Sequence, residues 1–268
     1  MSKRVSRVFC ILFLLLELAI VPKSVELMLG QHLSYLAPVQ IVILSMTFGS
    51  IALCILMAFS AMSEQRSYPM HTFLFELMVF LCCVAPVTDL FTRMLDSAGR
   101  PGMSMLVNTA FYLVGVNMAY AIMLYELLIV GTDGKPVLKK LWKWATALMV
   151  LDNAATLLNV RYGFFFTITE NGGYRSAPTF WLSYIAPLLI VAVTVIVAAR
   201  EMRPGRQKRA FLFFWVFAIV TMVLQIWRED LTLQYTGYAL TMLVIYVNVQ
   251  NELDTAGNNP QREEEDRI

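Results

Sequence analysis

Eight stretches of almost uninterrupted hydrophobic residues follow one another along the chain, separated by short polar segments. The stretches cover about residues 5–21, 39–62, 72–95, 103–130, 138–159, 179–199, 210–226 and 231–249. An α-helix needs about 20 apolar residues to cross the hydrocarbon core of a bilayer. Because lipid offers no partner to backbone N–H and C=O groups, each stretch is predicted to form a helix. The pattern predicts an all-α membrane protein, a bundle of 7–8 transmembrane helices.

The first stretch has two interpretations. Lys3, Arg4 and Arg7 precede the apolar run 8–21, as in a signal peptide. No small-x-small cleavage site follows, however, and Glu17 interrupts the run, so we favour an uncleaved first span. We expect three parts: an N-terminal transmembrane or signal-anchor segment with an amphipathic stretch (1–38), a seven-helix sensor-like membrane domain (39–250) and a short acidic cytoplasmic tail (251–268), with no soluble domain attached.

One segment between the hydrophobic stretches has a pattern of its own. From Phe164 to Thr169 every residue is aromatic or β-branched, and the sequence Glu170-Asn171-Gly172-Gly173 follows. Asn and Gly adopt the positive φ angles that tight turns require. We therefore predict a small extracytoplasmic β-hairpin over the outer mouth of the bundle. The alternative is a simple connector.

Composition and charge agree with a membrane location and give an orientation. The chain is 58% hydrophobic and 15% charged, whereas soluble domains have about 45–50% apolar and about 25% charged residues. With the N-terminus in the cytoplasm and alternating spans, fifteen of the 21 Lys and Arg residues fall on the inner side. Since cytoplasmic loops are enriched in Lys and Arg, we predict a multi-pass protein of the cell membrane with both termini cytoplasmic.

Ionisable and amide side chains inside the expected spans are candidates for a ligand site, because such groups are costly in a bilayer and mark function. Asp89 follows Pro86 by three residues, so a helix kink and a carboxylate coincide. Aromatic and charged residues near the hairpin add to an outer vestibule, a composition that suits a small amphipathic ligand. The candidate ligand-binding residues are Asp89, Arg93, Asp152, Asn153, Asn159, Tyr162, Tyr174, Arg175 and Trp181.

Each of these candidates has a structural alternative. Asp89 and Arg93 are one turn apart and can form an internal ion pair. The asparagines can serve as hydrogen-bonding contacts between helices.

Catalytic and metal-binding motifs are missing from the sequence. It has no HExxH, GxSxG, phosphate-binding loop or CxxC pair, and its two histidines, His32 and His71, fall on opposite sides of the membrane. We therefore expect no enzyme activity, no metal and no cofactor.

Four groups of residues occur in an order that resembles that of a known protein family. They are Phe73-Leu-Phe-Glu-Leu before Thr88-Asp89, Asn108-Thr-Ala-Phe-Tyr before Met123-Leu-Tyr-Glu126, Asn159-Val-Arg-Tyr-Gly-Phe-Phe-Phe-Thr-Ile with Asn171-Gly-Gly-Tyr174, and Tyr246-Val-Asn-Val-Gln-Asn-Glu-Leu-Asp254. Over about residues 39–254 this order resembles the seven-helix membrane input region that precedes GGDEF (diguanylate cyclase) domains in many bacterial proteins. In that family a similar helix end runs into the cyclase domain as a signalling connector. Here no GGDEF signature follows Asp254, so the resemblance implies a bacterial sensor-like module with a separate output and gives no catalytic residue.

Two classes of function remain. The first is a sensory or regulatory protein that binds a small ligand at its extracytoplasmic face and signals through a cytoplasmic partner; the second is a small-solute transporter or permease. A polar path through the whole bundle would favour transport, but Asp89, Arg93 and Asp152 crowd the outer half, while Glu76 and Glu126 lie nearer the inner ends. This distribution favours sensing. The expected partners are membrane lipid, an unknown small-molecule ligand, a cytoplasmic signalling protein and a second copy of the chain as a homodimer, without nucleic acid.

Overall fold

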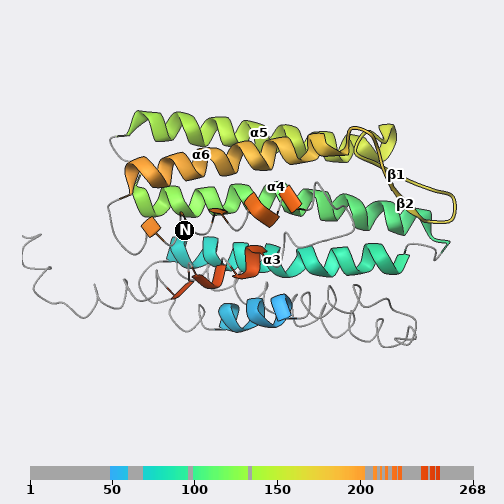
Figure 1. Ribbon diagram of the computed structural model, residues 1–268, viewed down its shortest axis with the longest axis horizontal. Coiled ribbons are helices and arrows are strands. Elements are labelled where there is room, and N and C mark those ends of the chain that lie inside the picture. Colours follow the sequence, from blue (N-terminus) through green and yellow to red (C-terminus); the bar gives the residue numbers. More distant parts are fainter. Residues whose placement is uncertain are drawn as a thin grey trace, which may run out of the picture.

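The computed structural model of the protein describes residues 49–59, 69–95, 99–131 and 135–202, with single residues and short runs between 208 and 247. Within these residues the chain is mostly helical and the long helices run along one common direction (Figure 1). The elements are the helix Gly49–Phe59, α3 (Pro69–Leu95), α4 (Pro101–Val130), α5 (Pro136–Tyr162), β1 (Phe166–Ile168), β2 (Tyr174–Ser176), the short 3-10 helix η2 (Phe180–Tyr184) and α6 (Ile185–Glu201).

Proline and glycine set the ends of α4 and α5. Each helix begins with a proline, Pro101 and Pro136, whose fixed φ suits the first helical position and whose missing N–H is not needed there. Each is followed by a glycine with positive φ, 71° at Gly131 and 66° at Gly163. Gly163 is in the left-handed conformation and its N–H donates to the carbonyl of Asn159 at 2.8 Å. Such a cap ends a helix sharply, so the chain can turn at once into the hairpin.

Three helical segments are long and apolar enough to cross a membrane. They are Thr72–Asp89 within α3, the whole of α4, and Phe180–Glu201, which joins η2 and α6. They coincide with the predicted stretches 72–95, 103–130 and 179–199, and they are consistent with the predicted membrane location.

The other predicted stretches have different outcomes. The stretch 138–159 forms α5, which has 27 residues but contains Lys139, Lys140, Lys143 and Asp152 and is not among the three apolar segments. The stretch 5–21 lies outside the described residues. The stretches 39–62, 210–226 and 231–249 are described only in part, so the predicted number of seven to eight spans stays a prediction.

Helix α4 is the centre of the bundle, because it packs against α3, α5, α6 and β1 (Figure 1). The core around it is apolar, and Trp215 and Tyr238 from the last part of the chain are fully buried in it. The two ends of the bundle are named by the helix termini found there. The hairpin end carries Leu95, Pro101, Tyr162 and Phe180, and the opposite end carries Pro69, Val130, Pro136 and Glu201.

The predicted hairpin is confirmed as a two-stranded antiparallel sheet of β1 and β2, in which Thr167 lies opposite Arg175. Its turn uses the predicted residues: Gly172 has φ 87°, and its N–H donates to the carbonyl of Thr169 at 2.9 Å. In Figure 1 the hairpin closes one end of the bundle.

Candidate functional site

Asn159 fastens the base of the hairpin to α5. Its side chain is fully buried, and its Oδ1 accepts from the backbone N–H of Phe165 at 2.6 Å and of Phe166 at 3.3 Å. Its Nδ2 donates to the carbonyl of Phe166 at 3.1 Å. One amide therefore satisfies three backbone groups of a buried loop, groups that would otherwise be costly to bury.

Two of the three consecutive phenylalanines pack down onto α4. Phe165 and Phe166 are buried. The ring of Phe166 is stacked with Tyr112 of α4 at a centroid distance of 5.0 Å and with Tyr174 of β2 at 5.8 Å. The hydroxyls of Tyr112 and Tyr174 share a hydrogen bond of 2.8 Å. Since aromatic pairs contribute about 0.5–1.5 kcal/mol each beyond their burial, this cluster holds the hairpin against α4.

The tip of the hairpin contacts the connection between α3 and α4. The N–H of Gly99 donates to the carbonyl of Asn171 at 3.1 Å. A Cβ at Gly172 would lie 3.1 Å from the carbonyl oxygen of Leu95 and 3.3 Å from the amide nitrogen of Arg100. The hairpin thus starts at α5, crosses α4 and ends against α3, so it connects three helices at one end of the bundle.

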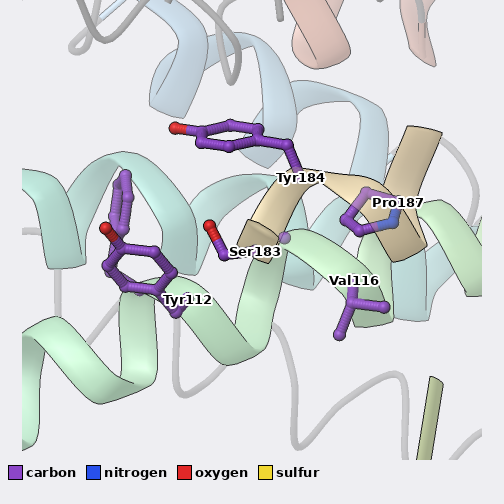
Figure 2. A pocket seen from close by; sticks show the side chains of 7 residues that line it. Tyr112, Val116, Ser183, Tyr184 and Pro187 are labelled. Atoms are coloured by element: carbon purple, nitrogen blue, oxygen red, sulfur yellow. The ribbon is translucent and has the colours of Figure 1, made fainter. Parts of the chain in front are cut away.

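A small cavity lies beside this aromatic cluster, between α4 and the start of α6 (Figure 2). Its volume is about 20 Å³, which is room for about one water molecule. Ser183 is buried and its hydroxyl donates to the carbonyl of Phe180 at 2.7 Å. The lining residues are Phe111, Tyr112, Gly115 and Val116 of α4, Ser183 and Tyr184 of η2, and Pro187 of α6. The lining thus combines aromatic rings with the hydroxyls of Tyr112 and Ser183.

The buried face of α5 is unusually polar. Its buried residues are Leu138, Ala145, Asp152, Thr156 and Asn159. The hydroxyl of Thr156 has no hydrogen-bond partner within the part of the chain that the structure describes. Polar side chains therefore continue from the hairpin base into the middle of the bundle.

An amide pair joins α4 and α5 next to this face. Asn117 Nδ2 donates to Asn153 Oδ1 at 2.9 Å, and Asn153 Nδ2 donates back to Asn117 Oδ1 at 3.3 Å. Reciprocal bonds of this kind are typical of contacts between transmembrane helices. The structural interpretation of Asn153 thus has direct geometric support.

On α3, Asp89 is buried and follows Pro86, which lies inside the helix as the sequence predicts. Thr92 donates from its hydroxyl to the carbonyl of Asp89 at 2.7 Å. Arg93 is in the same helix, but its side chain lies outside the described residues. The predicted Asp89–Arg93 pair therefore stays a prediction.

The nine predicted site residues fall into distinct groups. Asn159 and Tyr174 meet at the hairpin, and Asp152 and Asn153 lie deeper on α5. The side chains of Tyr162, Arg175 and Trp181 are exposed, with 63% for Tyr162 and 49% for Trp181, and none of these three lines the cavity. The described side chains among the nine thus do not gather at one cavity, and the vestibule as a whole stays a prediction.

Sequence reasoning missed Tyr112, which contacts both the hairpin and the cavity. One signal was available: a tyrosine in an apolar run must find a partner for its hydroxyl when it is buried. Gly115 and Ser183 gave no comparable signal.

No group of three or more His, Cys, Asp or Glu side chains that could hold a metal ion occurs in the ranges that the structure describes. No protein-family model, no curated protein and no solved structure matches the chain.

Proposed function

We propose that the chain is an integral membrane sensory or regulatory protein that binds a small amphipathic ligand beneath the hairpin and acts through a separate cytoplasmic partner. The observation that carries this proposal is the attachment of the hairpin to three helices. Asn159 fixes its base to α5, Phe166 packs on Tyr112 of α4, and Asn171 is bonded to Gly99 between α3 and α4. A ligand that displaces the hairpin therefore alters contacts of all three helices.

The cavity lining indicates the class of ligand. Rings of Phe111, Tyr112 and Tyr184 offer flat apolar surfaces, and the hydroxyls of Tyr112 and Ser183 offer hydrogen bonds. Ligand sites commonly combine an apolar wall with a few polar groups. Because the cavity holds about one water, a larger ligand enters it only when η2 moves away from α4. Tyr112, which lines the cavity and is hydrogen-bonded to Tyr174, links this movement to the hairpin.

The topology belongs to the same proposal. We place the hairpin end outside the cell membrane and both termini in the cytoplasm, with α5 as one of seven to eight spans. Lys135, Lys139 and Arg200 then lie at the cytoplasmic end, as the positive-inside rule requires. The similarity to membrane input regions of bacterial GGDEF proteins supports a sensor of this type, and a second copy of the chain is a further partner in this proposal.

Hydrogen exchange of the purified chain in lipid nanodiscs tests the proposal, with indole as a neutral aromatic probe that carries one N–H donor. Indole titration is expected to change the exchange of amides in β1 and β2 saturably. It is also expected to change the fluorescence of a probe attached at Lys139→Cys, close to the opposite end. The second readout is needed because a sensor must transmit the change.

A cavity-filling variant is the matched comparison. Gly115→Val adds a side chain in the cavity and is expected to abolish both responses, while Gly102→Val, at an exposed helical position with nothing within 4 Å, is expected to keep them. Responses that survive Gly115→Val, or a hairpin response without any change at the opposite end, would contradict the sensory function.

A transporter or permease is the second candidate, and buried acidic side chains at both ends of the bundle favour it. Asp89 and Asp152 are buried towards the hairpin end, and Glu76 and Glu126 towards the opposite end. Uptake of radiolabelled indole into proteoliposomes, compared with protein-free liposomes and with the Gly115→Val variant, separates the two functions. Protein-dependent uptake would support transport.

A further inference from the structure

Glu126 is a buried acidic side chain to which the described residues offer no group that would stabilise a negative charge. It is 0% exposed, and neither of its carboxylate oxygens has a hydrogen-bond partner within the described part of the chain. It also lies close to the C-terminal end of α4, where the unpaired helix carbonyls disfavour a negative charge. A buried carboxylate without a partner is so unfavourable that the group is neutralised instead.

A second buried acid lies at the same depth of the bundle. Glu76 of α3 is 1% exposed. Phe75 and Tyr125 directly precede the two glutamates, and the centroids of their rings are 6.3 Å apart. The ring of Tyr246 also packs against Phe75, with a centroid distance of 5.5 Å, and adds apolar cover to this layer. Burial in such an apolar layer disfavours the ionised form of an acid.

The basic side chains described at this end of the bundle are exposed or already bonded to other groups. Lys135 and Glu201 form a salt bridge of 3.0 Å, with both side chains 38% exposed. Lys139 and Arg200 are exposed at the start of α5 and the end of α6. The other buried acids, Asp89 and Asp152, belong to the hairpin half. None of these cations forms an ion pair with Glu126.

We propose that Glu126 is a proton-binding site: its carboxyl group holds a proton at neutral pH and exchanges it with water at the nearby end of the bundle. The ligand is a proton rather than a metal ion, because a carboxyl oxygen binds a proton alone, whereas cations such as Ca²⁺ need six or more oxygen ligands. No cluster of three acidic, His or Cys side chains surrounds it among the described residues. Fourteen residues of helix, roughly 21 Å at 1.5 Å per residue, separate it from Tyr112, so it is distinct from the hairpin cavity.

Infrared spectroscopy of the full chain in lipid nanodiscs at pH 7 tests this inference. The carbonyl stretch of a protonated carboxylic acid is expected in the parent, shifted in D₂O, and reduced in Glu126→Gln. Glu170→Gln, which changes the exposed glutamate at the hairpin tip, is the matched control and is expected to keep the parent band. A parent spectrum without this band, or a band unchanged in Glu126→Gln, would overturn the proposal.

Two further measurements distinguish a bound proton from a bound metal cation and from a charge that the fold requires. Addition of Na⁺, K⁺, Mg²⁺ or Ca²⁺ at constant pH is expected to leave the band unchanged; its loss would mean that Glu126 binds a metal cation. Because a neutral acid can be replaced by a neutral side chain of similar volume, Glu126→Gln and Glu126→Met are both expected to fold with parental thermal stability. If neither folds, Glu126 carries a charge that the fold requires, and the proton site is excluded.

Discussion

At the scale of single residues, four asparagines in this bundle satisfy the hydrogen bonds of their side-chain amides in three ways. Asn108 donates to the carbonyl of Ser104 one turn earlier in its own helix, at 2.8 Å. Asn153 pairs with Asn117 of the neighbouring helix, and Asn159 holds the backbone of the hairpin. Each of these amides bonds to protein groups, so in the proposed function the ligand is recognised by the side chains that line the cavity.

Asn159→Ala is expected to loosen the hairpin while the helices remain intact. The change leaves buried backbone groups of Phe165 and Phe166 without partners, at about 1–3 kcal/mol for each unsatisfied group. Hydrogen exchange of the amides from Phe166 to Ser176 should become faster in the variant. Asn108→Ala is the control, because that side chain bonds only within its own helix, and it should leave hairpin exchange unchanged. Equal exchange in both variants would contradict the anchoring role of Asn159.

The Asn117–Asn153 pair is expected to show energetic coupling in a double-mutant cycle with alanine. Hydrogen bonds between transmembrane helices contribute about 0.6 kcal/mol on average and at most about 1.7 kcal/mol, so two bonds predict a coupling of about 1 kcal/mol. The free energy of unfolding in mixed micelles gives this value. Strict additivity of the two single changes would mean that the pair contributes nothing to stability.

At the scale of the elements, the hairpin depends on two glycines for different reasons. Gly172 combines a positive φ with close backbone contacts, whereas Gly99 has a positive φ and nothing within 4 Å. Gly102 has an ordinary helical φ and open space around it. These three positions separate backbone strain from steric contact.

Alanine at these positions is expected to give a graded series. Gly102→Ala should not destabilise the protein. Gly99→Ala should lower the free energy of unfolding by about 1–2 kcal/mol, the energy of a left-handed conformation with a Cβ. Gly172→Ala should cost more than Gly99→Ala and should also weaken the response to indole, because the added methyl displaces the tip from α3. Equal stability of Gly99→Ala and Gly172→Ala would show that the contact at the tip is not tight.

The sequence predicted the helices and the hairpin better than it predicted the contacts between them. Continuous apolar stretches located α4 and α5 to within a few residues, and a run of aromatic and β-branched residues followed by Asn-Gly-Gly located the hairpin. These signals are local. The site depends on pairs such as Tyr112 with Tyr174 and Asn117 with Asn153, which are 62 and 36 residues apart. A single sequence does not reveal which face of one helix meets which face of another, so Asn153 was a ligand candidate and Tyr112 was not.

At the scale of the whole molecule, the bundle is organised around α4 and closed at one end by the hairpin. The other end carries the Lys135–Glu201 salt bridge and the start of α5, which is rich in lysine. This difference between the ends makes the orientation in the membrane testable.

Labelling with an impermeant maleimide on intact cells should modify Asn171→Cys but not Lys139→Cys, each in a background without the four native cysteines. Both positions are exposed, so accessibility reports the side of the membrane and not burial. After the membrane is permeabilised, Lys139→Cys should also be modified. Labelling of Lys139→Cys alone on intact cells would reverse the proposed topology.

The polar buried face of α5 has a consequence for how the chain is inserted into the membrane during its synthesis. An aspartate at the centre of an inserting helix opposes insertion by about 2.5–3.5 kcal/mol, and α5 contains Asp152 next to Asn153. When α5 leaves the ribosome, α4 has already been made and α6 has not. In the proposed topology α5 enters the membrane after α4, and we expect the two helices to insert together, because Asn117 of α4 pairs with Asn153 of α5. The expected unit of membrane insertion is then the pair of α4 and α5 rather than the single helix.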